Sequence, residues 1–268
     1  MSVDEIFNSF KTRAERALSL TGITTEIMDL VLDPLKKLID ECDSSIQGQN
    51  LLKNKITNSY NSILSAKEND SLKQKYKELD EQSIIIIVSA FEDFMSQLFM
   101  HLTTNYTKYI NWPEKLPLEL GQLKYKPKTS LAELIYSSLK GTGQINFQDL
   151  QSTIKYLEEK VGVDSKKIFT DQNLKNKIIL FQAVRHSLVH NQGRIDPRFL
   201  NQIRETGFLE SFEKDKVLSI NAEMVKDCME SFVTLAEKIS SLVKDKINEW
   251  EPPIIVDGKT INIDDIPF

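Results

Sequence analysis

Apolar residues recur along this chain at intervals of three and four residues, the spacing that places them on one face of an α-helix. Only 9 Gly and 8 Pro interrupt the 268 residues, and so few breakers favour helices over a fold of many short strands. We therefore expect a mainly α protein. At approximate bounds, the pattern predicts helices over residues 3–20, 27–39, 49–66, 81–109, 131–139, 150–162, 172–191, 198–206 and 222–250.

The connections between these helices show weaker patterns. Residues 67–79 are rich in Lys, Glu and Asp, and we favour a solvated helical shaft over a linker. Pro34 lies within the second pattern and is expected to kink or split that helix. Residues 113–127 contain three prolines and predict an irregular connection. Residues 216–220 suggest a short strand, and the tail after Pro253 predicts a small hairpin turning at Asp257-Gly258.

The start signals of several helices can be read from single polar residues. Ser130 is expected to cap the helix that follows it, Asn146 or Asp149 the next, and Asp171 the helix over 172–191. The organisation that we expect has three parts: an N-terminal helical region over 1–79, a helical domain over 80–250 and a C-terminal tail over 251–268.

The composition is that of a soluble globular protein, with 40% hydrophobic and 27% charged residues. The longest apolar run, Ile84–Val88, is far too short to span a membrane, and the N-terminus lacks the build of a signal peptide. Two cysteines, Cys42 and Cys228, form neither a disulfide framework nor a metal-ligand spacing. We expect a cytoplasmic protein without a cofactor.

Charge is unevenly distributed along the chain. The net charge of −5 argues against general attraction to nucleic acid. Residues 155–204, however, contain ten Lys or Arg against five acids, which gives this segment +5 and leaves −10 for the rest. This segment could therefore hold a local site for an anionic ligand.

The basic segment contains residues 181–191, the part of the chain with the most distinctive chemistry. At helical spacing its apolar members form one stripe: Phe181, Val184 and Leu188. Its polar members lie on the other side: Gln182, Arg185, His186 and His190. Asn191 and Gly193 supply a helix stop, and Asp196-Pro197 prevents easy continuation. Two imidazoles and a guanidinium are thus held near the carbonyl end of a helix, which favours their positive charge.

Four interpretations of this cluster compete. The residues can simply cap the helix and pair with surface acids. His186 and His190 have zinc-like i, i+4 spacing, but the glutamate of a zincin helix is missing and the chain has one other histidine, His101. Ser187 is directed about 100° away from His186 and is not in a nucleophile elbow. In the fourth interpretation, histidine transfers protons at a phosphodiester while arginine binds the phosphate.

The run Arg185-His186-Ser187-Leu188-Val189-His190 follows the pattern Arg, polar residue, three further residues, His. It resembles the signature of the HEPN (higher eukaryote and prokaryote nucleotide-binding) superfamily, many of whose members are metal-independent RNases of toxin, antiphage and CRISPR systems. The resemblance covers roughly residues 81–250. It implies a HEPN-like helical bundle, with extra N-terminal helices and a small C-terminal β-hairpin outside it.

The resemblance also implies roles for individual residues. His190 would be general base or acid, Arg185 would bind the phosphate and the transition state, and His186 would orient or transfer a second proton. Asn191 would fix the helix end. Glu92 resembles an acid that the family often has near the site on an earlier core helix, although a simple ion pair with Lys or Arg explains it equally well. Four lysines would lead RNA toward the cleft: Lys166, Lys167, Lys175 and Lys177.

HEPN proteins usually work as dimers in which two signature helices meet, and Val189 is a small apolar residue within the polar arc where such a contact would form. The expected partners are an RNA substrate, a second copy of the chain, and an antitoxin or sensor protein, with no metal and no membrane. Two other hypotheses stay open. One is a non-catalytic HEPN-like module that binds nucleotide or protein, and the other is a structural subunit held through its N-terminal helices.

Overall fold

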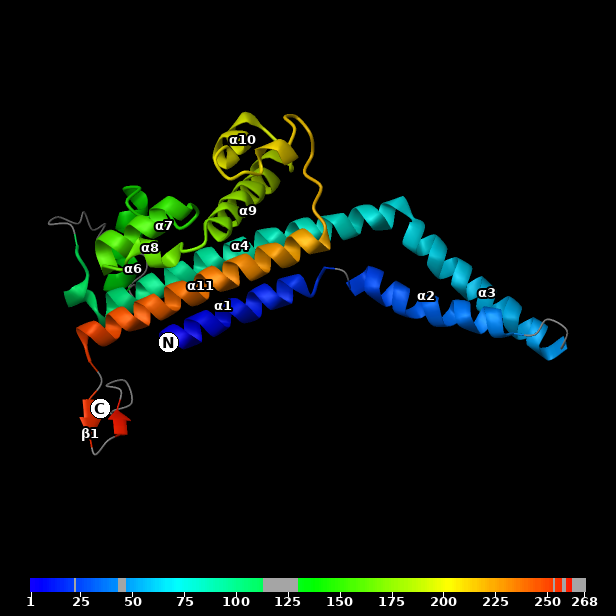
Figure 1. The fold of residues 1–268 in the computed structure, drawn as a ribbon, viewed down its shortest axis with the longest axis horizontal. Helices are drawn as coiled ribbons and strands as arrows, with labels where there is room; N and C mark the ends of the chain where they lie inside the picture. Colours follow the sequence, from blue (N-terminus) through cyan, green and yellow to red (C-terminus); the bar gives the residue numbers. More distant parts are fainter. Residues whose placement is uncertain (22, 43–46, 113–129, 253, 257–258, 262–268) are drawn as a thin grey trace.

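The computed structural model describes residues 1–21, 23–42, 47–112, 130–252, 254–256 and 259–261, and this part of the chain is mainly α-helical, as expected. Figure 1 shows the arrangement of the elements. The α-helices are α1 (Val3–Leu18), α2 (Ile23–Glu41), α3 (Gln47–Glu68), α4 (Asp70–Asn105), α6 (Leu131–Gly141), α7 (Leu150–Tyr156), α8 (Ser165–Ile168), α9 (Gln172–Asn191), α10 (Pro197–Ile203) and α11 (Ala222–Trp250). Short 3-10 or π segments are η1 (Thr107–Tyr109), η2 (Leu157–Val161) and η3 (Leu209–Ser211).

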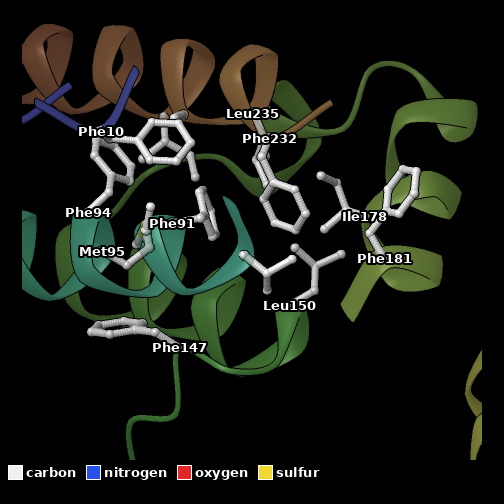
Figure 2. Close-up of a cluster of buried hydrophobic side chains, with 14 of the residues drawn as sticks. Phe10, Phe91, Phe94, Met95, Phe147, Leu150, Ile178, Phe181, Phe232 and Leu235 are labelled. Atoms are coloured by element: carbon white, nitrogen blue, oxygen red, sulfur yellow. The ribbon is translucent and has the colours of Figure 1, made fainter. Parts of the chain in front are cut away.

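Three long helices, α1, α4 and α11, lie side by side and form the centre of the fold (Figure 1). Their shared core is aromatic: the Phe91 ring lies 6.0 Å from that of Phe10 on α1 and 5.0 Å from that of Phe232 on α11. Figure 2 shows these rings in one cluster, with Ile178 and Phe181 of α9 beside Phe232. Burial of this apolar surface joins the three helices and fixes α9 against them.

α4 is the helix on which the N-terminal and C-terminal parts both pack. The single residue Asn69 separates the end of α3 at Glu68 from the start of α4 at Asp70, so the polar segment 67–79 is helical except at Asn69. Residues 79 and 80, where we expected a domain boundary, both lie within α4. α1 belongs to the same core, because its apolar residues recur at three and four along one buried face.

Polar residues begin the helices around the site as expected. Ser130 and Glu133 form a capping box at α6, Asp149 accepts from the Ser152 N–H at α7, and Asp171 accepts from the Asn173 N–H at α9. These oxygens satisfy N–H groups that the first helical turn leaves without partners.

Several local predictions need correction or completion. α2 continues through Pro34, so proline does not split it. Residues 163–169, between the helices expected over 150–162 and 172–191, contain the four-residue α8. The strand expected over 216–220 is reduced to a single bridge between Arg194 and Val217. Residues 113–127 lie outside the described residues.

After α11, β1 (Ile254–Val256) pairs antiparallel with β2 (Lys259–Ile261), and Ile254 lies opposite Ile261. The expected turn residues, Asp257 and Gly258, lie outside the described residues, so the hairpin as a whole stays a prediction. Among the described helices, Gln74–Asn105 is long and apolar enough for a membrane span, but 56% of its most apolar window is buried in the protein. A core helix of a soluble protein has the same properties.

Candidate functional site

The apolar face of α9 is held in the core, and this orients its polar face outward. Ile178, Phe181 and Val184 are buried, at 1% exposure or less. On another side of the helix, the Gln182 side-chain oxygen accepts a hydrogen bond from the Leu150 N–H at 3.2 Å. This bond ties the beginning of α7 to the middle of α9. The start of α7 is thereby placed beside Arg185, which is one turn further along α9.

A cleft of about 660 Å³ follows the polar face of α9. α4 and the segment around the start of α7 contribute one part of its wall, and α10 with the residues after it contributes another. Asn176 anchors this second wall by donating to the Thr206 carbonyl at 2.9 Å. The expected site residues that line the cleft are Glu92, Lys175, Arg185, His186 and His190. The structure therefore brings together the signature residues and the acid on α4.

Arg185 and Glu92 face each other across the boundary between α9 and α4. Arg185 Nη2 lies 3.7 Å from Glu92 Oε1, and the two side chains are 16% and 18% exposed. The Arg185 Nε–H is buried and has no hydrogen-bond partner among the described residues. A buried guanidinium N–H ordinarily finds an acceptor, so this one keeps unused hydrogen-bonding capacity where α9 packs against α4.

The pKa of the Glu92 carboxyl group is set by opposing effects. Burial raises the pKa of its carboxyl group above the ordinary value of 4.5, while Arg185, a side-chain hydrogen bond from Gln148 and the charge of Lys140 act in the opposite direction. Desolvation is the largest of these effects, so the carboxylate is not fully compensated by Arg185. The Glu92 carboxylate thus remains incompletely stabilised, and the Arg185 Nε–H has no acceptor among the described residues. Such a pair is typical of functional sites, and some structural ion pairs share these properties.

The two histidines of α9 lie on consecutive turns and touch. Their ring centroids are 4.7 Å apart, with the planes inclined at 45°. Burial lowers the pKa of His186 below 6.5, and the positive charges of Arg198 and Arg185 and the nearby His190 lower it further, against a smaller opposite effect of Asp196. His186 is therefore neutral at neutral pH and able to accept a proton. His190 is more exposed and lies at the rim.

Two side chains near the end of α9 fix the helix to the turn that follows it. Asn191 Nδ2 and Ser187 Oγ both donate to the Arg194 carbonyl, at 2.8 and 2.7 Å. The chain then reverses through two left-handed residues, Gln192 at φ 53° and Gly193 at φ 72°. The expected role of Asn191 in fixing the helix end is thus visible in its hydrogen bond to the turn.

The four expected lysines lie in different places. Lys175 lines the cleft. Lys177, two residues along the same helix, points elsewhere and forms an ion pair with Asp227 of α11. Lys166 and Lys167 are exposed on α8 and do not line the cleft. The segment's basic surplus is therefore only partly directed at the site.

Sequence reasoning missed the α10 side of the cleft. Arg198 and Arg204 line it, as do eight amide side chains: Asn146, Gln148, Gln151, Gln172, Asn176, Gln182, Asn201 and Gln202. The amides on α9 were detectable, because Gln172, Asn176 and Gln182 precede His186 at helical spacings on its own face. The α10 residues had no such signal, since only the turn after α9 brings them across from the histidines.

No group of three or more His, Cys, Asp or Glu side chains that could hold a metal ion is found among the described residues. Comparisons with protein-family models, with curated proteins and with solved structures found no match for this chain.

Proposed function

We propose that this protein is a HEPN-type, metal-independent endoribonuclease of a bacterial antiphage or toxin–antitoxin system. The observation that supports the proposal is the convergence of Arg185, His186 and His190 on one cleft, with a buried Arg185 N–H that has no acceptor among the described residues. The solubility of the protein does not require two touching imidazoles beside a guanidinium that is largely shielded from water, because removing a charged group from water costs free energy.

The proposed reaction uses the 2′-OH of the substrate as nucleophile. The 2′-oxygen bonds to the adjacent phosphorus and the bond from phosphorus to the 5′-oxygen of the next nucleotide breaks. One group accepts the 2′-OH proton and another donates a proton to the departing oxygen, leaving a 2′,3′-cyclic phosphate and a free 5′-OH. DNA lacks this hydroxyl, so the activity is restricted to RNA.

The residues suit separate parts of this reaction. His186 is neutral at neutral pH and fits the proton acceptor, while His190 fits the second proton-transfer group. Arg185 binds a non-bridging phosphate oxygen and stabilises the charge that grows in the transition state. Glu92 holds the guanidinium in position, and Asn191 holds the helix end on which His190 stands.

In this proposal a second copy of the chain completes the site. His186 and His190 touch on the same side of the cleft, whereas the attacking and leaving oxygens lie on opposite sides of the phosphorus. A two-fold arrangement of two α9 helices would supply catalytic groups from both directions. Val189 is 44% exposed beside these residues and offers an apolar contact for such an arrangement.

The substrate is held by the remaining cations of the cleft. Arg198 lies close enough to affect His186, and Lys175 lies about three turns away from it along α9. At 1.5 Å per residue, the eleven residues from 175 to 186 span about 16 Å, the length of two to three nucleotides of an extended strand. Lys175 and Arg204 therefore fit contacts to phosphates away from the cleavage point.

The deciding experiment is an incubation of labelled total RNA with the purified protein in EDTA, followed by analysis of end groups. Wild type is expected to cleave and leave 2′,3′-cyclic phosphate or 3′-phosphate ends. Arg185→Ala and His190→Ala are expected to lose at least 100-fold in rate, about the loss seen on removing one transition-state donor. His101→Ala removes the one histidine outside the cleft and serves as the matched control.

A second candidate is a non-catalytic module that binds a nucleotide or a short nucleic-acid segment. The eight amides of the cleft favour this candidate, because amides can pair with base edges without taking part in proton transfer. This function would be supported over the nuclease if folded protein bound a 2′-deoxy oligonucleotide and left RNA intact after prolonged incubation.

If Arg185→Ala and His190→Ala cleaved RNA at the wild-type rate, the proposed active site would be wrong.

A further inference from the structure

The cleft has an apolar surface between its lysine and its histidines. Among the residues of α9 that line the cleft, Ile179 is the one apolar side chain. It lies four residues after Lys175 and seven before His186, on the same face of the helix. Ile154 of α7 lines the same cleft. Both isoleucines are partly buried and pack against the hydrophobic core, so they present a fixed apolar surface to the cleft.

Most of the amide side chains that line the cleft already bond to other parts of the protein. These engaged amides are Asn146, Gln148, Gln172, Asn176, Gln182 and Asn201. The two others, Gln151 of α7 and Gln202 of α10, are exposed and make no hydrogen bond within the described part of the chain. These two amides, on different walls of the cleft, are therefore available to a ligand.

Gln151 lies beside the apolar surface. It precedes Ile154 by three residues, so the two side chains share one side of α7. Its neighbour Leu150 donates its N–H to Gln182 Oε1 at 3.2 Å, and Gln182 follows Ile179 by three residues on α9. This bond brings the amide of Gln151 and both isoleucines to one part of the cleft, each within about one helical turn of it.

An apolar surface bordered by an available amide fits a nucleobase better than a phosphate. The flat face of a base packs on apolar side chains, and its edge carries the hydrogen-bond donors and acceptors. A glutamine whose oxygen and NH2 group are both available pairs bidentately with adenine, accepting from N6 and donating to N7, whereas arginine pairs with guanine. A purine also covers more of the isoleucine surface than a pyrimidine does, because its two rings have a larger area.

We propose that Ile154, Ile179 and Gln151 form a nucleobase subsite that selects adenine close to the cleavage point. The inference rests on the proposed function, in which the cleft holds an RNA strand. The seven residues from Ile179 to His186 span about 10 Å along α9, the length of one to two nucleotides of an extended strand. The subsite thus reads a base one or two nucleotides from the scissile phosphate, and Gln202 supplies a second amide from α10. The enzyme then cuts beside adenine rather than at every phosphate.

Binding of short non-cleavable strands tests the subsite on the full chain. Fluorescence anisotropy measures the affinities for 2′-deoxy octamers of adenine, cytosine and thymine. Wild type is expected to bind the adenine octamer at least about 5-fold more tightly, the discrimination of one bidentate pair. Gln151→Ala should remove most of this preference. Gln151→Glu keeps the size of the side chain but only accepts, so it should shift the preference toward cytosine, whose N4 donates.

Gln144→Ala is the matched control, because Gln144 is an exposed glutamine shortly before α7 that does not line the cleft. Its affinity ratios should equal those of wild type. Circular dichroism checks that each variant is folded. The subsite is overturned if wild type binds the three octamers equally or prefers a pyrimidine. It is also overturned if the adenine preference survives both substitutions of Gln151.

Cut sites mapped on a random-sequence RNA in EDTA separate this inference from the nuclease proposal. Wild type is expected to show adenine enriched at one fixed position within two nucleotides of the cut, and Gln151→Ala to lose this enrichment. A preference for the adenine octamer without any RNA cleavage supports the subsite and refutes the nuclease. Cleavage without adenine enrichment at any position refutes the subsite alone.

Discussion

The guanidinium of Arg185 on α9 lies 3.7 Å from the carboxylate of Glu92 on α4, and both side chains are less than one-fifth exposed. This pair joins two helices that are far apart in the sequence, at the floor of the cleft. The distance is too long for a tight ion pair, and the Arg185 Nε–H has no acceptor among the described residues. The pair holds Arg185 in place without exhausting its hydrogen-bonding capacity.

Arg185→Gln is expected to lower the free energy of unfolding at pH 7 by roughly 1–3 kcal/mol, because it leaves the partly buried Glu92 carboxylate without its cation. Adding Glu92→Gln to this variant should restore much of the loss, since neither charge then remains. Urea denaturation of the two single variants, the double variant and wild type measures this coupling. Strictly additive effects of the two substitutions would show that the residues do not interact.

The raised pKa of Glu92 predicts a pH dependence of stability. Because burial raises the pKa above 4.5 in the folded state, the folded protein binds this proton more readily than the unfolded chain. The resulting stability is fully present below pH 4.5 and is lost as the pH rises through the folded pKa. Relative to Glu92→Gln, wild type should therefore gain stability between pH 7 and pH 4.5. A constant difference across urea titrations at these pH values would contradict this.

Arg198→Gln is expected to raise the pKa of His186, because Arg198 is the largest charge effect that lowers it. The ring proton shifts of His186, followed by NMR from pH 5 to pH 8, measure the change directly. If His186 accepts the 2′-OH proton, the acidic limb of the pH–rate profile should move upward with it. Lys177→Gln is the control, since that lysine pairs with Asp227 and lies outside the cleft.

Lys175 and Lys177 provide a matched pair for substrate binding. Lys175→Ala is expected to weaken the affinity for a non-cleavable 2′-deoxy oligonucleotide by 3- to 10-fold, and to reduce the slope of log K against log salt by about 0.7. Lys177→Ala removes the same charge two residues away, on a different side of α9, and should leave both quantities nearly unchanged. Fluorescence anisotropy at several salt concentrations distinguishes the two. Equal losses would mean that net charge alone attracts the strand.

Asn191→Ala is expected to destabilise the protein by about 0.5–1.5 kcal/mol, because the Arg194 carbonyl loses one of its two side-chain donors. RNA cleavage should fall further than the unfolded fraction explains, since His190 stands on the same final turn. Gln192→Gly is the local control: it relieves a left-handed non-glycine residue at φ 53° and should stabilise the protein by roughly 0.5–1 kcal/mol. Thermal unfolding and cleavage rates compare these variants.

Much of the fold could be read from local chemistry. The helices over the core, the caps at Ser130, Asp149 and Asp171, and the stop after Asn191 depend on spacing and on side chains that bond within a few residues. The strand expected over 216–220 failed for the opposite reason. A strand exists only when a partner is available along its length, and here Val217 meets Arg194 in a single bridge.

The residues of the cleft likewise divide into those that local spacing predicts and those that depend on contacts between distant segments. The sequence alone placed Arg185, His186 and His190 on one face of one helix, because helical geometry follows from residue spacing. It also presented Glu92 as an acid on a buried helix, without showing that this helix and α9 meet. That the two do meet, and that Arg185 lies against Glu92, results from the packing of Phe181 and Ile178 among residues of other helices.

The sequence by itself thus determined the helices, their ends and the chemical groups on the exposed face of α9, since these depend on neighbours three or four residues apart. Only the tertiary structure decided that Arg198 and Arg204 line the same cleft as the histidines, and that Lys175 enters this cleft while Lys177 pairs with Asp227. The physical reason is that contacts between distant segments depend on how whole helices pack, and no local spacing specifies that packing.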